Sequence, residues 1–173
     1  MTGLVGEATS APDQEPMMHP YPHLYTAAAS GRPEGNVALT SPSLPEITTA
    51  PPPEFDGPGD VWSPETLLCA SLADCFVLSF RAIARASRLE WSDLKCRVEG
   101  VLERVDGVTQ FTRYTTFANL RVSPGIDADK ARRLLEKADH LCLISNSLRG
   151  KRTLVAEVVN SAAQATFSGA DST

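Results

Sequence analysis

The 173-residue sequence contains few histidines, cysteines and aromatic residues: three His, four Cys, and 6% Phe, Trp and Tyr. Four cysteines are too few for a scaffold held by disulfides. Three histidines without paired spacing predict no metal site. CxxC, HExxH, GxGxxG and P-loop motifs are missing, so we expect no bound cofactor. No window approaches 18 apolar residues, which predicts that no helix spans a membrane.

The charge balance and the first residues narrow the class of protein further. Sixteen Lys and Arg against 21 Asp and Glu give a net charge of −5, which argues against nucleic acid as a partner. The opening MTGLVGEATSAPDQEP lacks a basic start and an apolar run, so we expect no secretory signal and a cytoplasmic location. In a reducing cytosol a cysteine is either a small buried hydrophobe or a chemical group.

The length predicts one domain. Residues 1–19 read as a disordered leader and residues 161–173 as a flexible tail, because both are rich in small and polar residues. Residues 20–160 form the expected domain.

The first half of that domain predicts strands followed by a long helix. Residues 25–49 read as a hairpin around the turn Gly31-Arg32-Pro33-Glu34-Gly35 and a third strand. After a Pro/Gly-rich stretch at 50–60, Ser63-Pro64-Glu65 has the pattern of a helix start, and no Gly or Pro interrupts the sequence up to Ser87.

The second half predicts two long antiparallel strands, 93–107 and 108–123, joined at Asp106-Gly107. A helix over 128–140 capped by Asp127, a short apolar turn over 141–148 and a strand over 152–159 follow. Strands and helices are largely segregated, so the fold class is α+β. Because few helices are available to cover the long apolar one, we expect it to be buried against a second copy in a homodimer.

Two cysteines are candidates for chemistry. Cys75 lies mid-helix on the face of Leu72 and Phe76, and Cys142 is followed by Ser145 and Asn146. The residues alone leave packing and reactivity equally open for both. Cys69 and Cys96 are interpreted as structural.

Three segments resemble the osmotically inducible protein C / organic hydroperoxide resistance (OsmC/Ohr) family. SPETLLCASLADCF is similar to its helix with Pro-Glu and a reactive cysteine ten residues after the Glu, which points to Glu65 and Cys75. HLCLISNSLRGK is similar to its second cysteine motif, here Cys142, and YTAAASGRPEGNV to its first hairpin, whose turn carries an arginine, here Arg32. Leu143 stands where the family commonly has Pro, which leaves the local geometry at Cys142 open.

The resemblance implies an OsmC-like fold, with antiparallel sheets around a long central helix in an intertwined homodimer. It also implies a thiol peroxidase for organic hydroperoxides, in which Cys75 becomes a sulfenic acid and condenses with Cys142 to a disulfide. A dithiol reductant of the lipoyl type would reset the pair.

The same resemblance gives Arg32 and Glu65 roles beside Cys75. A thiolate needs a nearby cation or donor, and a carboxylate can orient an arginine. On the residues alone, Arg32 is interpreted as a solvated turn residue, and Glu65 as an acid that complements the helix dipole, a role compatible with orienting an arginine. The apolar residues nearest the cysteines in sequence predict a pocket for an alkyl or lipid-like hydroperoxide: Trp62, Leu72, Phe76, Leu141 and Ile144.

Helix geometry adds a prediction about subunits. Ten residues put Glu65 and Cys75 about 15 Å apart along one helix, too far for a glutamate side chain to span. We therefore expect Cys75 and Cys142 from one chain to meet Glu65, and with it Arg32, from the partner. The alternative function is a non-enzymatic module of the same fold that binds an apolar ligand in the dimer cleft.

Overall fold

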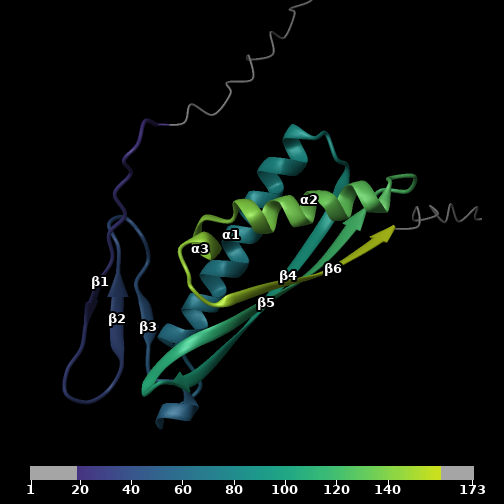
Figure 1. The fold of residues 1–173 in the computed structure, drawn as a ribbon. Helices are drawn as coiled ribbons and strands as arrows, with labels where there is room; N and C mark the ends of the chain where they lie inside the picture. Colours follow the sequence, from purple (N-terminus) through teal and green to yellow (C-terminus); the bar gives the residue numbers. More distant parts are fainter. Residues whose placement is uncertain (1–18, 161–173) are drawn as a thin grey trace, which may run out of the picture.

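The computed structural model describes residues 19–160, so the expectations for the tail and for nearly all of the leader lie outside the described residues. Three strands precede a long helix, and two strands, two helices and a last strand follow it, in the order expected (Figure 1). The elements are β1 Ala28–Ser30, β2 Val37–Thr40, β3 Ile47–Thr49, η1 Pro53–Phe55, α1 Pro64–Ala86, β4 Trp91–Val105, β5 Val108–Val122, α2 Ala128–Leu141, α3 Leu143–Asn146 and β6 Lys151–Asn160.

The first three strands form a small antiparallel sheet in the order β1-β2-β3. Its hairpin turn carries Arg32, as expected. The sheet makes only marginal contact with the other elements of the chain, and most of its residues are exposed. A backbone hydrogen bond from the Ala50 N–H to the Trp62 carbonyl (3.0 Å) ties its last strand to the start of α1.

Helix α1 begins where the sequence predicts. Ser63 is the N-cap, and its hydroxyl oxygen accepts a hydrogen bond from the Thr66 N–H (3.2 Å). The Thr66 hydroxyl oxygen in turn accepts from the Ser63 N–H (2.8 Å), which completes a capping box. With Pro64 at the first helical position, this end of the helix is fixed, and so is the place of Glu65 one residue later.

The expectation that no helix could span a membrane needs correction. Over α1 an 18-residue window reaches a mean hydropathy of 1.8, enough by length and composition alone for a span. The count of uninterrupted apolar residues missed it because Ser71, Asp74 and Ser79 break the run. Core helices of globular folds pass the same test, and the face carrying Phe76 and Phe80 is buried inside this fold.

The second sheet has the order β4-β5-β6. Strands β4 and β5 form a hairpin closed by Asp106 (φ 50°) and Gly107 (φ 82°), the conformation that a two-residue turn requires. The sheet departs from the antiparallel expectation in one pair, because β6 runs parallel to β5. Parallel neighbours need a long crossover, and here α2 and α3 supply it.

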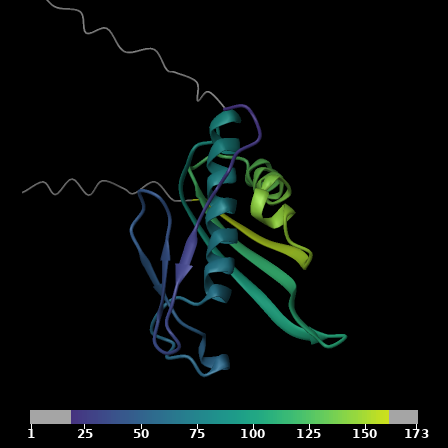
Figure 2. The ribbon, with the colours of Figure 1, turned by 90° about the vertical axis from the view of Figure 1, so that its left-hand side faces the viewer.

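Helices α1 and α2 pack on one face of this sheet, and α1 runs between the two sheets (Figure 2). Alternate residues of β5 from Tyr114 to Val122 are buried on that face. Fully buried side chains at the centre include Phe76, Phe80, Leu120 and Leu135, each of which stabilises the fold by roughly 1.5–3 kcal/mol. The predicted α+β class is confirmed.

Candidate active site

Two thiols from distant parts of the chain meet at the middle of α1. Cys75 is partly buried on the helix, and Cys142 is completely buried at the junction of α2 and α3. The two side chains are hydrogen-bonded to each other, and both cysteines are free thiols.

The surroundings of Cys142 act on its acidity in both directions. Burial is the largest effect and raises the pKa of the thiol, because burial disfavours the charged form. The hydroxyl of Ser145 lowers that pKa, and the neighbouring Cys75 raises it. Ser145 is itself buried, with 6% of its surface exposed.

The turn that carries Cys142 is held by hydrogen bonds on both sides. The Asn146 side-chain amide donates to the His140 carbonyl (3.0 Å) and its oxygen accepts from Arg152 of β6 (2.9 Å). The Asn146 N–H donates to the Cys142 carbonyl (3.0 Å). Leu143, at the position where Pro is common, is the first residue of α3. The first helical position accepts either residue, so the replacement keeps the local helix.

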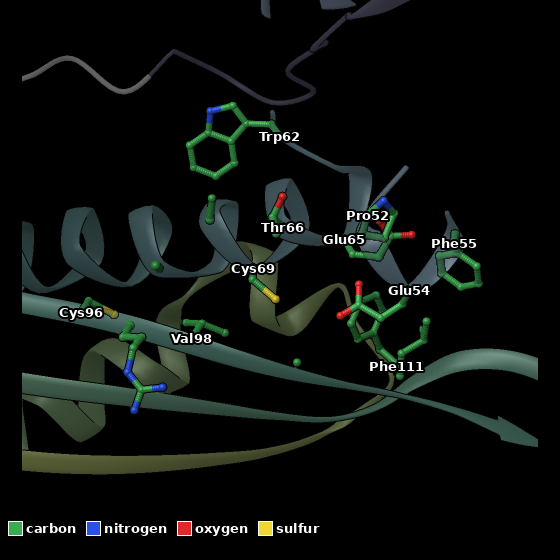
Figure 3. A pocket seen from close by; sticks show the side chains of 15 residues that line it. Pro52, Glu54, Phe55, Trp62, Glu65, Thr66, Cys69, Cys96, Val98 and Phe111 are labelled. Atoms are coloured by element: carbon green, nitrogen blue, oxygen red, sulfur yellow. The ribbon is translucent and has the colours of Figure 1, made fainter. Parts of the chain in front are cut away.

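Glu65 lies at a separate place on α1, beside a cavity of about 530 Å³ between this helix and the strands β4 and β5 (Figure 3). Trp62, Cys69 and Phe111 also line the cavity. Among residues 19–160, Glu65 Oε2 is the one buried side-chain oxygen or nitrogen without a hydrogen-bond partner. A buried carboxylate oxygen without a donor is costly, and no group among the described residues donates to this atom.

The other residues predicted for the site, Arg32 and the five apolar residues, do not lie together in one chain. Arg32 lies in the turn between β1 and β2, outside the cavity that Glu65 lines. Of the five apolar residues expected at a substrate pocket, Trp62 alone lines that cavity. Leu72 and Phe76 are core side chains, 3% and 1% exposed, whereas Leu141 and Ile144 are exposed near Cys142. Within one chain these five do not form a common pocket, and their role stays a prediction.

Cys69 and Cys96 occupy the wall of the same cavity. The Gly100 N–H donates to the Cys69 sulfur, yet burial raises the pKa of that thiol. Burial, and secondarily the nearby Cys142, raises the pKa of Cys96 to about 11. Both thiols therefore stay protonated near neutral pH and are weak nucleophiles, in keeping with the structural role expected. No cluster of three or more potential metal ligands occurs within the described part of the chain.

Sequence reasoning recognised Ser145 and Asn146 only as members of a motif. Their functions in the fold, as donor to the Cys142 sulfur and as brace of the α2–α3 turn, become visible only when the turn is built. The one sequence signal for them is their position three and four residues after Cys142, where a helical turn brings side chains back together.

Comparison with known proteins identifies the family. The model of the family described as OsmC-like protein matches residues 57–157, more than half of the chain. The chain belongs to the OsmC-like protein family. The matched residues include Glu65, Cys75 and Cys142, whereas Arg32 precedes them.

Curated relatives and solved structures of the OsmC-like family extend the match. The chain is 32% identical to the organic hydroperoxide resistance protein of Xanthomonas axonopodis pv. citri, over 78% of this chain and 94% of the relative. It is 29% identical to the uncharacterized protein YmaD of Bacillus subtilis, over 71% and 79%. An organic hydroperoxide resistance protein of Legionella pneumophila superposes with a TM-score of 0.63 at 27% identity, covering 79% of this chain and 96% of that one. An OsmC-like protein of Vibrio cholerae reaches 0.70 at 17% identity, covering 79% and 99%, and shares the fold.

Proposed function

We propose that this OsmC-like protein is a thiol-dependent peroxidase that reduces organic hydroperoxides to alcohols through a disulfide cycle of Cys75 and Cys142. The observation that carries the proposal is the hydrogen bond between the two thiols, in a chain where they are 67 positions apart. The named activity of the Xanthomonas and Legionella relatives supports the substrate class.

The cycle begins at Cys75, the more accessible of the two thiols. Its thiolate attacks one peroxide oxygen, the O–O bond breaks, and the alkoxide takes up a proton to leave as the alcohol. The Cys75 sulfenic acid then condenses with Cys142, the S–O bond breaks, and water leaves. A dithiol reductant, expected to be of the lipoyl type, exchanges with the disulfide and restores both thiols.

The site is completed in a homodimer, in which Glu65 and Arg32 of one protomer serve Cys75 of the other. Three observations support this part of the proposal. Glu65 Oε2 is buried without a donor, the sheet that carries Arg32 has little contact with its own chain, and Leu78 on the outer face of α1 is half exposed. Arg32 is the type of group that satisfies the carboxylate and also stabilises a thiolate.

A second function, binding of an apolar ligand without catalysis, is favoured by one observation. The cavity beside Glu65 is lined largely by apolar side chains, among them Trp62, Phe55 and Phe111, and about 530 Å³ is the size of a small-molecule site.

A thiol count after addition of cumene hydroperoxide separates the two functions. The peroxidase loses two thiols per chain rapidly, faster than with hydrogen peroxide, and the binding module loses none. Turnover with dihydrolipoamide, glutathione and thioredoxin, compared side by side, then identifies the reductant. Stable thiols in the presence of excess cumene hydroperoxide would rule out the peroxidase.

A further inference from the structure

The sulfur of Cys142 has an environment unlike that of any surface thiol. It has no exposed surface, so water cannot stabilise a negative charge on it. Cys75 is in contact with it, and Cys96 is close enough to act on it through charge. Both neighbours are thiols, and neither offers a strong hydrogen-bond donor.

Ser145 is the neighbour of Cys142 that offers a strong hydrogen-bond donor to its sulfur. It lies three residues after Cys142, one turn of α3 later, and its hydroxyl donates a hydrogen bond to the Cys142 sulfur. Ser147, two residues further on, is different. It is exposed, and its hydroxyl donates to the Leu143 carbonyl (2.9 Å) instead. Of these two serines, only Ser145 is directed at the thiol pair.

The surrounding turn keeps Ser145 in this orientation. Asn146 is held between the His140 carbonyl and the Arg152 side chain. The Ser145 carbonyl accepts a hydrogen bond from the Leu148 N–H (3.2 Å). With the backbone fixed before and after it, and with only 6% of its surface exposed, the Ser145 side chain has little freedom to turn away from the sulfur.

We propose that the Ser145 hydroxyl stabilises negative charge on the Cys142 sulfur by donating a hydrogen bond to it, and thereby controls the second half of the thiol cycle. This proposal rests on the proposed peroxidase function. It assigns to Ser145 no role in the attack of Cys75 on peroxide, because its contact is with the other sulfur.

Two steps place charge on the Cys142 sulfur. In the first, the Cys142 thiolate attacks the sulfur of the Cys75 sulfenic acid. The S–S bond forms, the S–O bond breaks, and the departing hydroxide combines with the proton that Cys142 released. In the second, a reductant thiolate attacks Cys75, which is accessible where Cys142 is not. The S–S bond then breaks, Cys142 leaves as a thiolate, and it is reprotonated when the second reductant thiol closes the reductant's own disulfide. Ser145 keeps its proton throughout.

The test is a single-turnover measurement on the full chain with one equivalent of cumene hydroperoxide. Ser145→Ala removes the hydroxyl donor, and Ser147→Ala, which alters a serine of the same turn away from the sulfur, is the matched control. In Ser145→Ala we expect peroxide consumption at the wild-type rate. Disulfide formation should be about tenfold slower or more, as expected for the loss of one hydrogen bond to a charged group, and its pH midpoint should move upward. Ser147→Ala should match wild type in both steps.

Two further variants guard against a purely structural effect. Ser145→Thr keeps the hydroxyl and should restore most of the rate of disulfide formation and its pH midpoint. If Ser145→Ala does not fold, Ser145→Gly removes the same hydroxyl with less demand on packing and should give the same slow step. Equal rates of disulfide formation in wild type and the folded hydroxyl-free variant would overturn the proposal for Ser145. A wild-type protein that consumes no hydroperoxide would instead overturn the proposed function.

Discussion

The buried thiol of Cys142 and the thiol of Cys75 are hydrogen-bonded across the contact between α1 and the turn that joins α2 to α3. One is completely enclosed and the other is partly accessible. In the proposed peroxidase this asymmetry gives them different chemical roles: an incoming peroxide would reach Cys75 first, and the product of that reaction would then meet Cys142.

The first prediction concerns the order of the two thiols. Cys75→Ser should abolish peroxide consumption, because a serine hydroxyl does not ionise to a comparable nucleophile at neutral pH. Cys142→Ser should allow one turnover and stop with a sulfenic acid on Cys75. Mass spectrometry after one equivalent of peroxide distinguishes these products. A first turnover that survives in Cys75→Ser would reverse the assignment.

The second prediction concerns the subunit that supplies Glu65. Chains with Cys75→Ser and chains with Glu65→Ala should each be inactive, whereas their heterodimer should recover activity. One of its two sites then unites an intact Cys75 with an intact Glu65. Activity is measured after subunit exchange, with heterodimers verified by mass. If proven heterodimers stay inactive, each chain carries its own complete site.

The third prediction concerns Arg32. Arg32→Ala should slow the first step, the consumption of peroxide, far more than it lowers the melting temperature, because in the proposed dimer Arg32 supplies the charge beside the partner's thiolate and its own turn is exposed. Arg85→Ala, which removes an exposed arginine near the other end of α1, is the control and should leave the rate unchanged. Equal rates for both variants would make Arg32 an ordinary surface residue.

The fourth prediction concerns the packing of Gly100. A Cβ at this position would lie 2.8 Å from the Phe111 ring and 3.0 Å from the Cys69 sulfur. Gly100→Ala should therefore destabilise the fold by about 1–3 kcal/mol, although alanine is normally the better residue in a strand. Urea denaturation measures the effect, with the exposed Lys95→Ala of the same strand as control. Phe111→Leu should recover part of the loss, and a Gly100→Ala variant as stable as wild type would contradict the packing argument.

The fifth prediction concerns pH. Because burial raises the pKa of Cys96 from 9.0 to about 11, the folded chain holds this proton more tightly than the unfolded chain. The stabilisation is complete below pH 9, and the free energy of unfolding should fall as pH rises from about 9 to about 11. Burial of Cys69 and Cys142 acts in the same direction. Denaturation at a series of pH values should show a shallower decline for Cys96→Ala than for wild type, and identical slopes would contradict the assignment.

Local signals in the sequence were sufficient to predict most of the helices and strands. Ser63 and Pro64 fix the start of α1 through a capping box that involves only neighbouring residues. Asp106 and Gly107 fix the hairpin of β4 and β5 in the same way. The parallel pairing of β6 with β5 could not be derived in this manner, because it depends on how the crossover through α2 packs on the face of the sheet and not on any short pattern.

The candidate site could be predicted only in part, because local patterns do not show which distant side chains meet in the fold. Helical periodicity placed Phe76 on the inner face of α1, but periodicity cannot distinguish a pocket wall from the core, and Phe76 belongs to the core. The Cys75–Cys142 contact followed from family resemblance, since nothing in either local sequence requires the other. The partner that we propose for Glu65, an arginine of a second chain, cannot be tested in the structure of one chain.

The distance along the chain between the two thiols also bears on the order of folding. The β4–β5 hairpin involves neighbouring segments, whereas Cys142 lies on the crossover that must fold back before β6 can pair with β5. Local contacts close sooner than distant ones, so we expect the hairpin and α1 to form first and the crossover last. A nascent or partly folded chain then has Cys75 but not yet its neighbour. Under the proposed mechanism, oxidation at that stage would stop at the sulfenic acid or proceed beyond it, and the chain would acquire protection against overoxidation only with its last folding step.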